Sequence, residues 1–266
     1  MSDVAIPTPR KMGINWIGLG TIIRREWSRV WRVPIQAFLA PWISALMFIF
    51  IFGFVVGARM PRIAGHNYIE FVLPGVLMLN IVNAAFLQST SQIYFQRFLR
   101  YIEETLVAPL SYVEMIIGSL IMTIVRAVVT AVGILVIGML FGATHMNNIF
   151  EFLFWIIAVS VIFGLLGIII ALWANNFEQL TMLNVFFIAP LSFVGGVFNT
   201  VTMLPPWLKW MAYANPFFYF INGLRDSMIG FDEAPPFLGY GVTLGLIAVL
   251  GLATWRLFSI GYGLRE

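Results

Sequence analysis

The sequence predicts an all-α, polytopic membrane protein with six transmembrane helices, an N-terminal interfacial amphipathic helix and two outer re-entrant half-helices. Apolar residues make up 61% of the 266-residue chain and charged residues only 10%, whereas soluble domains have about 25% charged residues. Six apolar runs approach or exceed the roughly 20 helical residues that cross the hydrocarbon core of a bilayer. Almost every charged residue lies between these runs. Six such spans fill roughly half of the chain, which leaves no room for a separate soluble catalytic domain.

The N-terminal segment precedes the first span. Residues 1–13 contain Pro7 and Pro9 and are predicted to be a disordered tail. Residues 14–32 predict an amphipathic helix, in which tryptophans lie opposite arginines, as is typical of a helix in the membrane interface. The apolar side holds Trp16, Leu19, Ile23, Trp27, Val30 and Trp31, and the polar side holds Arg25, Ser28, Arg29 and Arg32. A helix packed on a protein core is the alternative.

The six spans and their loops form one predicted domain over residues 14–258, followed by a short tail at 259–266. An even number of spans puts both termini on one side of the membrane. That side carries ten Lys and Arg residues in its loops and termini, and the opposite side carries four. Because basic residues concentrate in cytoplasmic loops, both termini are predicted to be cytoplasmic. The predicted spans are residues 37–56, 69–91, 113–141, 149–173, 180–198 and 237–258.

Residues 95–109 form the most charged loop on the predicted cytoplasmic side. The segment is long enough for about three helical turns. It alternates charged with apolar residues, which predicts a short amphipathic helix able to transmit a movement from a soluble partner. A helix that merely connects two spans is the alternative. The charged residues assigned to coupling are Arg97, Arg100, Glu103 and Glu104.

Residues 202–230 are too apolar for a free loop. Pro205 and Pro206 favour the start of a helix, and Asn215–Pro216 should break it, because the residue before proline avoids the helical conformation. Aromatic residues in this segment suit the headgroup region. We therefore expect two half-helices that enter the outer leaflet. A broken seventh and eighth span is the alternative, although each piece is well short of 20 residues.

Two spans carry polar residues at helical spacing, and these amides and hydroxyls must face protein or water rather than lipid. They predict either the lining of a pathway or polar contacts that hold helices together. Arg126 lies well inside the third span, where a cation costs about 2.5–3.5 kcal/mol. It is a candidate functional residue or a structural anchor. The second span carries Asn80, Asn83, Gln88 and Ser91, and the fifth carries Thr181, Asn184, Ser192 and Asn199.

Several motifs are missing from the sequence. There is no phosphate-binding G-x-x-x-x-G-K-[ST] loop, no G-x-S-x-G elbow and no cysteine. The two histidines, His66 and His145, lie in different loops without zinc-site spacing. The chain is therefore expected to be non-catalytic by itself, with no metal or cofactor of its own, and its basic residues are explained by the membrane rather than by nucleic acid.

The loop and third-span start, FQRFLRYIEETLVAPLSYVEMIIG, resemble those of ABC-2-type transporter permeases. Further motifs match in the family's order over nearly the whole chain. They are LPG at Leu73–Gly75, GGVF at Gly195–Phe198, LPPW at Leu204–Trp207, NPFFY at Asn215–Tyr219 and GLR at Gly223–Arg225.

This resemblance implies the membrane subunit of an ATP-driven exporter in the inner membrane. The permease would form a homodimer with two cytoplasmic ATPase subunits, which would hold the ATP and magnesium. Residues 95–109 would be the coupling helix, and the second and fifth spans would line the path. An ion-coupled carrier and a non-transporting scaffold are the alternatives, although the spans contain no acidic pair for a proton relay.

Overall fold

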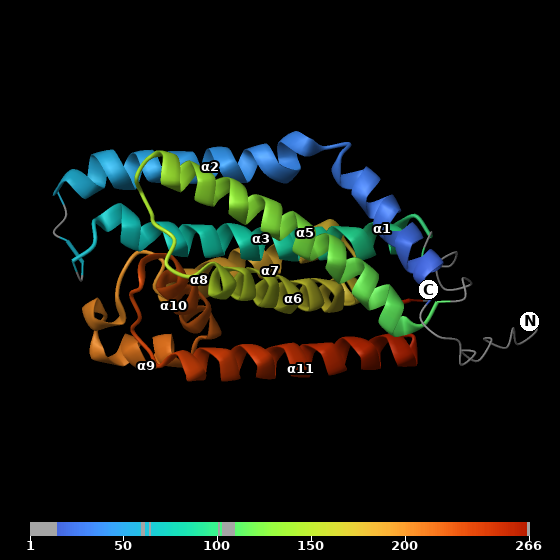
Figure 1. Ribbon diagram of the computed structural model, residues 1–266. Helices are drawn as coiled ribbons and strands as arrows, with labels where there is room; N and C mark the ends of the chain where they lie inside the picture. The colour runs from blue at the N-terminus through green and yellow to red at the C-terminus, as the bar shows by residue number, and fades with distance from the viewer. Residues whose placement is uncertain (1–14, 60–61, 64, 101, 103–109, 265–266) are drawn as a thin grey trace, which may run out of the picture.

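The computed structural model describes residues 15–59, 62–63, 65–100, 102 and 110–264, which form a bundle of helices (Figure 1). Within these ranges the sole β-type contact is an isolated bridge between Ile63 and His66. Six helical stretches are long and apolar enough to cross a membrane. The predicted all-α, polytopic fold is therefore confirmed.

The helices agree with the predicted spans, with shifts at their ends. The fourth span has the bounds that the apolar run predicts, whereas the second continues to Phe98 and is 31 residues long. The elements are α1 (Trp16–Val30), η1 (Ile35–Leu39), α2 (Ala40–Ile49), η2 (Phe50–Val56), η3 (Gly57–Arg59), α3 (Tyr68–Phe98), α5 (Tyr112–Leu140), α6 (Ile149–Trp173), α7 (Phe177–Leu183), η4 (Asn184–Ile188), α8 (Ala189–Val194), η5 (Val201–Met203), α9 (Pro206–Ala214), α10 (Pro216–Ile229) and α11 (Pro236–Ile260).

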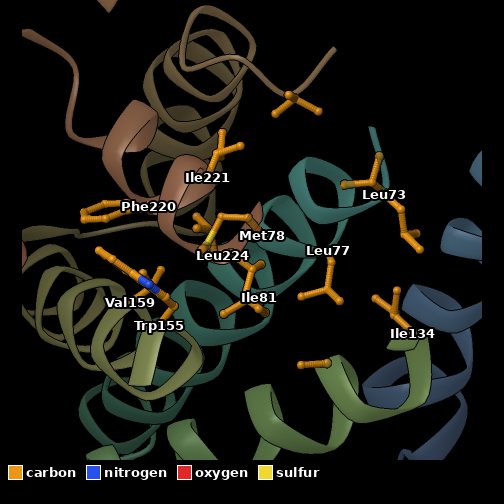
Figure 2. Close-up of a cluster of buried hydrophobic side chains, with 14 of the residues drawn as sticks. Leu73, Leu77, Met78, Ile81, Ile134, Trp155, Val159, Phe220, Ile221 and Leu224 are labelled. Carbon is orange, nitrogen blue, oxygen red and sulfur yellow. The ribbon is translucent and has the colours of Figure 1, made fainter. Parts of the chain in front are cut away.

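Helix α3 is the centre of the bundle and packs against α5, α6 and α10. In its most apolar stretch 72% of the residues are buried, against 17% for the first, fifth and sixth spans. Figure 2 shows side chains from α3, α5, α6 and α10 meeting in one core. The first, fifth and sixth spans therefore leave most of their apolar surface uncovered by this chain.

The starts of three helices are fixed by side chains that accept hydrogen bonds from free backbone N–H groups. Asn67 with Glu70 and Ser111 with Glu114 form capping boxes at α3 and α5. The Asn148 carboxamide oxygen accepts from two backbone N–H groups at the start of α6. These polar residues mark where each span leaves its loop.

The first and fifth spans contain π-helical turns just before a proline. η1 precedes Pro41, and η4 precedes Pro190. Proline has no N–H and crowds the carbonyl four residues earlier. The backbone widens there, and Ala40 N–H bonds to Ile35 O while Ala189 N–H bonds to Asn184 O. Both π-helical turns lie in spans of which only a small share is buried within this chain.

Helix α1 lies within the predicted interfacial segment, and part of its predicted apolar side faces the protein. Its buried residues are Leu19, Ile22, Glu26 and Val30, and they face α5. The tryptophans at 16, 27 and 31 are exposed. Leu19 and Val30 of the predicted apolar side therefore pack on protein, together with the Glu26 carboxylate, and the tryptophans beside them are not covered by the described part of the chain.

The outer segment divides at the predicted place. Helix α9 begins at Pro206, α10 begins at Pro216, and Asn215 between them is extended. The Asn215 side chain caps α10 by accepting from Phe217 N–H at 3.0 Å, and its Nδ2 donates to Leu191 O at 2.6 Å. Helix α10 is largely buried against α3 and α6, whereas Trp207 and Trp210 of α9 are exposed.

Gly167 lets α6 lie directly against α3. A Cβ built at this position would overlap the Ser89 hydroxyl and come within 2.9 Å of the Phe86 carbonyl oxygen. We expect Gly167→Ala to lower the free energy of unfolding by about 1–3 kcal/mol, because backbone atoms cannot move aside. Unfolding of the purified protein in mixed micelles measures this change. Gly245→Ala in α11 is the matched control, since nothing lies within 4 Å of its Cβ; equal effects of the two substitutions would contradict the prediction.

Candidate functional site

The polar residues of the second and fifth spans meet at one point. Asn184 Nδ2 donates to Asn83 Oδ1 at 2.8 Å and joins η4 to α3. Asn83 and Asn80 also donate to backbone carbonyls one turn earlier, Leu79 O and Val76 O, each at 2.9 Å. All three asparagines are half-buried. The structure therefore brings Asn83 and Asn184 together and leaves them partly accessible on one side of the bundle.

The other predicted lining residues do not gather around this pair. Ser192 is buried and donates to Ile188 O at 2.7 Å, and exposed Thr181 donates to Glu178 O at 2.9 Å. Asn199 follows α8 and donates to Thr200 O at 3.4 Å, and Ser91 is half-buried on α3. Most of these groups donate hydrogen bonds to carbonyl oxygens of their own segment. Their role as a pathway lining stays a prediction.

Three glutamines on α3, spaced four residues apart, hold α3 to its neighbours in the half of the bundle nearest the termini. Gln88 accepts from Arg126 Nη1 at 2.9 Å and Gln92 accepts from Ser119 Oγ at 3.2 Å, both across the contact with α5. Gln96 Nε2 donates to Glu26 of α1 at 3.5 Å. Of the three, sequence reasoning identifies only Gln88, and the i, i+4 spacing of the set is the signal that could have found the others.

Arg126 therefore has a partner, which the sequence alone does not identify. Its guanidinium reaches from α5 to the buried Gln88 side chain. Arg126 Nε and Gln88 Nε2 are buried and have no hydrogen-bond partner within the described ranges. The pair links two central spans with part of its hydrogen-bonding capacity unused.

Glu26 continues this polar seam into α1. Glu26 is 3% exposed. Its carboxylate forms an ion pair with Arg29 at 3.0 Å and a longer one with Arg25 at 3.5 Å. A buried carboxylate needs such partners, because removal from water is costly for a charge. Nothing in the sequence pattern separates Glu26 from the arginines around it. We call the contacts of Glu26, Gln96, Gln92 and Gln88 the polar seam.

The region assigned to coupling is described in part. Arg97 Nη1 donates to Ala171 O at 2.5 Å and to Ala174 O at 3.1 Å, at the C-terminal end of α6 where carbonyls are free. Arg100 is exposed and has a positive φ of 59°, which ends α3. Glu103 and Glu104 lie outside the described residues. Arg97 thus fixes the end of α3 to the end of α6, and the coupling role of residues 95–109 stays a prediction.

A second charged cluster lies at the other end of the bundle. Arg225 of α10 is 1% exposed, and its guanidinium stacks 3.8 Å from the centre of the Phe71 ring. It donates to Phe71 O at 3.2 Å and to Gly196 O at 2.7 Å, and Glu233 lies 3.8 Å away. Sequence reasoning treats Arg225 as an outer-loop charge. The signal that could have identified Arg225 as a buried, paired residue is its position in an apolar half-helix, eight residues before Glu233.

Glu233 extends this cluster to two further segments. Its Oε1 accepts from Val201 N–H at 3.0 Å, and its own N–H donates to Asn222 Oδ1 at 2.6 Å. Burial raises the pKa of the Glu233 carboxyl, and the neighbouring Arg225 opposes that shift. Burial lowers the pKa of Arg225 to about 10, which Glu233 opposes in turn. Together the two residues join α3, the turn after α8, η5 and α10.

Comparison with known proteins bears on this arrangement of six spans, a charged segment after the second and two outer half-helices. The family model described as "ABC-2 type transporter" matches residues 18–229. The chain belongs to this family. The match begins in α1 and ends with α10, so it includes the polar seam and Arg225, whereas Glu233 lies beyond it.

Named relatives agree with the assignment. The chain is 28% identical over 255 residues to "Inner membrane transport permease YadH" of Escherichia coli K12, covering 96% of this chain and all of the relative. It is 23% identical over 239 residues to "Nodulation protein J" of Rhizobium leguminosarum bv. viciae, covering 89% of this chain and 91% of that protein. This ABC-2 family member is therefore a transporter permease.

Proposed function

We propose that this permease is the membrane subunit of an ATP-driven exporter. The observation that carries the proposal is the combination of ABC-2 family membership with a sequence that lacks any phosphate-binding loop. A transporter of this family without its own nucleotide site needs separate ATPase subunits, and we propose two in each complex. ATP and magnesium belong to those subunits, and this chain holds no cofactor and binds no nucleic acid.

We propose that residues 95–109 receive the movement of the ATPase subunits and pass it to the spans. Arg97 attaches the end of α3 to the end of α6, so a push on this segment reaches two central spans. Arg100, with Glu103 and Glu104, supplies charges for the ATPase surface. Helix α1 lies on the same end of the bundle (Figure 1) and is joined to α3 through Glu26 and Gln96.

The proposed pathway lies between two copies of the chain. The fifth span buries little of its surface, and Val185, Phe186 and Phe187 are all exposed. The half-buried Asn83–Asn184 contact joins η4 of this span to α3. A second copy covering this span would place the asparagines at the boundary between protomers, and lipid would cover the remaining apolar surface.

The proposed location is the inner membrane, with both termini cytoplasmic. The relative YadH is named as an inner membrane permease. The end of the bundle with the start of α1 and the end of α11 also holds the end of α3 and the start of α5, which flank the proposed coupling segment in the sequence (Figure 1). The excess of Lys and Arg residues on that side supports the same orientation.

Co-purification of this chain with an ABC ATPase from the same organism tests the proposal. We expect an ATPase to be retained by the wild-type permease and by Arg59→Glu, which changes an exposed charge at the opposite end of the bundle. We expect retention to fall about tenfold in Arg100→Glu and in Glu103→Lys/Glu104→Lys, because like charges then oppose across the contact. Uphill transport by the permease alone in liposomes would overturn the proposal, and unchanged retention in both variants would overturn the role of the segment.

A further inference from the structure

A cavity of about 510 Å³ lies beside α9. Figure 1 shows α9 at the end of the bundle opposite the start of α1. The cavity lies between the segment before α3, η5, α9 and the segment that joins α10 to α11. Its size falls within the range of about 300–1,000 Å³ that is usual for small-ligand sites. It is separate from the polar seam and from the Asn83–Asn184 contact, so its use does not follow from the proposed function and does not rest on it.

The cavity presents charges of both signs that do not neutralise one another. Arg62 and Asp232 are exposed on its walls, and within the described part of the chain neither forms an ion pair. Glu233 lines the same cavity with a side chain that is 8% exposed. One of its oxygens is held by Val201 N–H, and the other lies 3.8 Å from Arg225 without a hydrogen bond in the described ranges.

The remaining walls are aromatic and apolar. Tyr213 and Phe231 line the cavity with aromatic rings, which can attract a cation. Ile63 and Met203 add apolar surface. The helix that contributes Tyr213 also bears the exposed Trp207 and Trp210. Tryptophan and tyrosine gather at the depth of the lipid headgroups, so this composition places the cavity at the membrane–water interface.

We propose that this cavity binds a zwitterionic phosphoethanolamine group. The ammonium would lie toward Asp232, Glu233 and the aromatic rings, and the phosphate would lie toward Arg62. An anion alone would meet the two carboxylates, and a cation alone would leave Arg62 unpaired, whereas a ligand with both charges satisfies both walls. The apolar walls suit the glycerol and first acyl carbons of a phospholipid, and the same headgroup chemistry exists in a soluble form.

Binding to the purified full-length chain in detergent tests the site. The probes are dihexanoyl phosphatidylethanolamine, dihexanoyl phosphatidylglycerol and water-soluble glycerophosphoethanolamine, with native mass spectrometry to measure occupancy. We expect the ethanolamine lipid to bind about tenfold more tightly than the glycerol lipid, because only the former supplies a charged donor to the carboxylates. Equal binding of glycerophosphoethanolamine would assign the site to a soluble zwitterion, and weaker binding would assign it to the lipid.

Two variants on the cavity wall and two controls complete the experiment. Arg62→Gln and Asp232→Asn should each weaken ethanolamine-lipid binding about tenfold, because each removes one charged contact. Both residues are exposed, so an unchanged melting temperature will show that the fold is retained. Arg59→Gln in the same loop and Glu178→Gln at the other end of the bundle lie outside the cavity and should bind like wild type. The proposal is overturned if the glycerol lipid binds as tightly, or if the controls lose binding as the wall variants do.

Discussion

Arg225→Met should unfold far more easily than the wild-type chain, with a loss of about 3–5 kcal/mol in the free energy of unfolding. The substitution keeps an apolar stem over the Phe71 ring but removes the donors to Phe71 O and Gly196 O. It also leaves the Glu233 carboxylate buried beside no cation. Unfolding in mixed micelles, followed by far-ultraviolet circular dichroism, measures the loss.

The double variant Arg225→Met/Glu233→Gln separates the ion pair from the rest of the cluster. It removes the uncompensated charge, so it should recover part of the lost stability and show coupling between the two sites. Arg59→Met, an exposed arginine at the same end of the bundle, is the control and should change stability by less than about 0.5 kcal/mol. A single Arg225→Met variant as stable as this control would show that the buried pair contributes little.

Much of the fold was predictable because membrane crossing depends on features that are local in sequence. The fourth apolar run has the same bounds as α6, since both its ends are marked by polar residues. The break between α9 and α10 is predicted by Pro216, whose effect on the preceding residue is local. The length of a segment, its apolar composition and its prolines act on that segment alone. The sequence of one segment is therefore enough to predict whether it is helical and where it breaks.

The partners of buried polar groups were not predictable in the same way. Arg126 is recognisable as unusual, but its bond to Gln88 depends on how α5 and α3 are rotated about their axes. The same holds for Arg225, which stacks on a ring 154 residues away in sequence. Periodicity shows which residues share a side of a helix and leaves open which neighbour that side meets.

Helix α1 is an example of this limit. Its tryptophans suggest that its apolar side lies in lipid, yet the side that packs on α5 contains Glu26. A carboxylate held by flanking arginines is compatible with burial, so the charges on this helix do not all mark its solvent side. The contact of α1 with the bundle therefore includes a hydrogen bond from Gln96 to Glu26 beside its apolar contacts, and reversing the charge of Glu26 should release it.

Glu26→Lys should detach α1 from α5 and α3. The new cation would be buried between Arg25 and Arg29, where like charges repel, and Gln96 would lose its acceptor. We expect docking of α1 to weaken by roughly 3 kcal/mol, which is more than a hundredfold in the docking equilibrium. In the assembled transporter we also expect transport to fall further than ATP hydrolysis, because α1 would no longer move with α3.

A disulfide between α1 and α5 can measure docking directly, because the chain contains no cysteine that would compete. A Cβ at position 118 lies 3.5 Å from the Ile22 Cβ, which is compatible with a disulfide between Ile22→Cys and Gly118→Cys. Oxidation should cross-link this pair readily in the wild-type background and at least about tenfold more slowly with Glu26→Lys, since cross-linking depends on the docked population. Ser28→Lys adds a cation on the exposed side of the same helix and should leave the rate unchanged. If Glu26→Lys cross-links as fast as Ser28→Lys, the buried carboxylate does not hold α1 in place, and the remaining apolar contacts of the helix suffice.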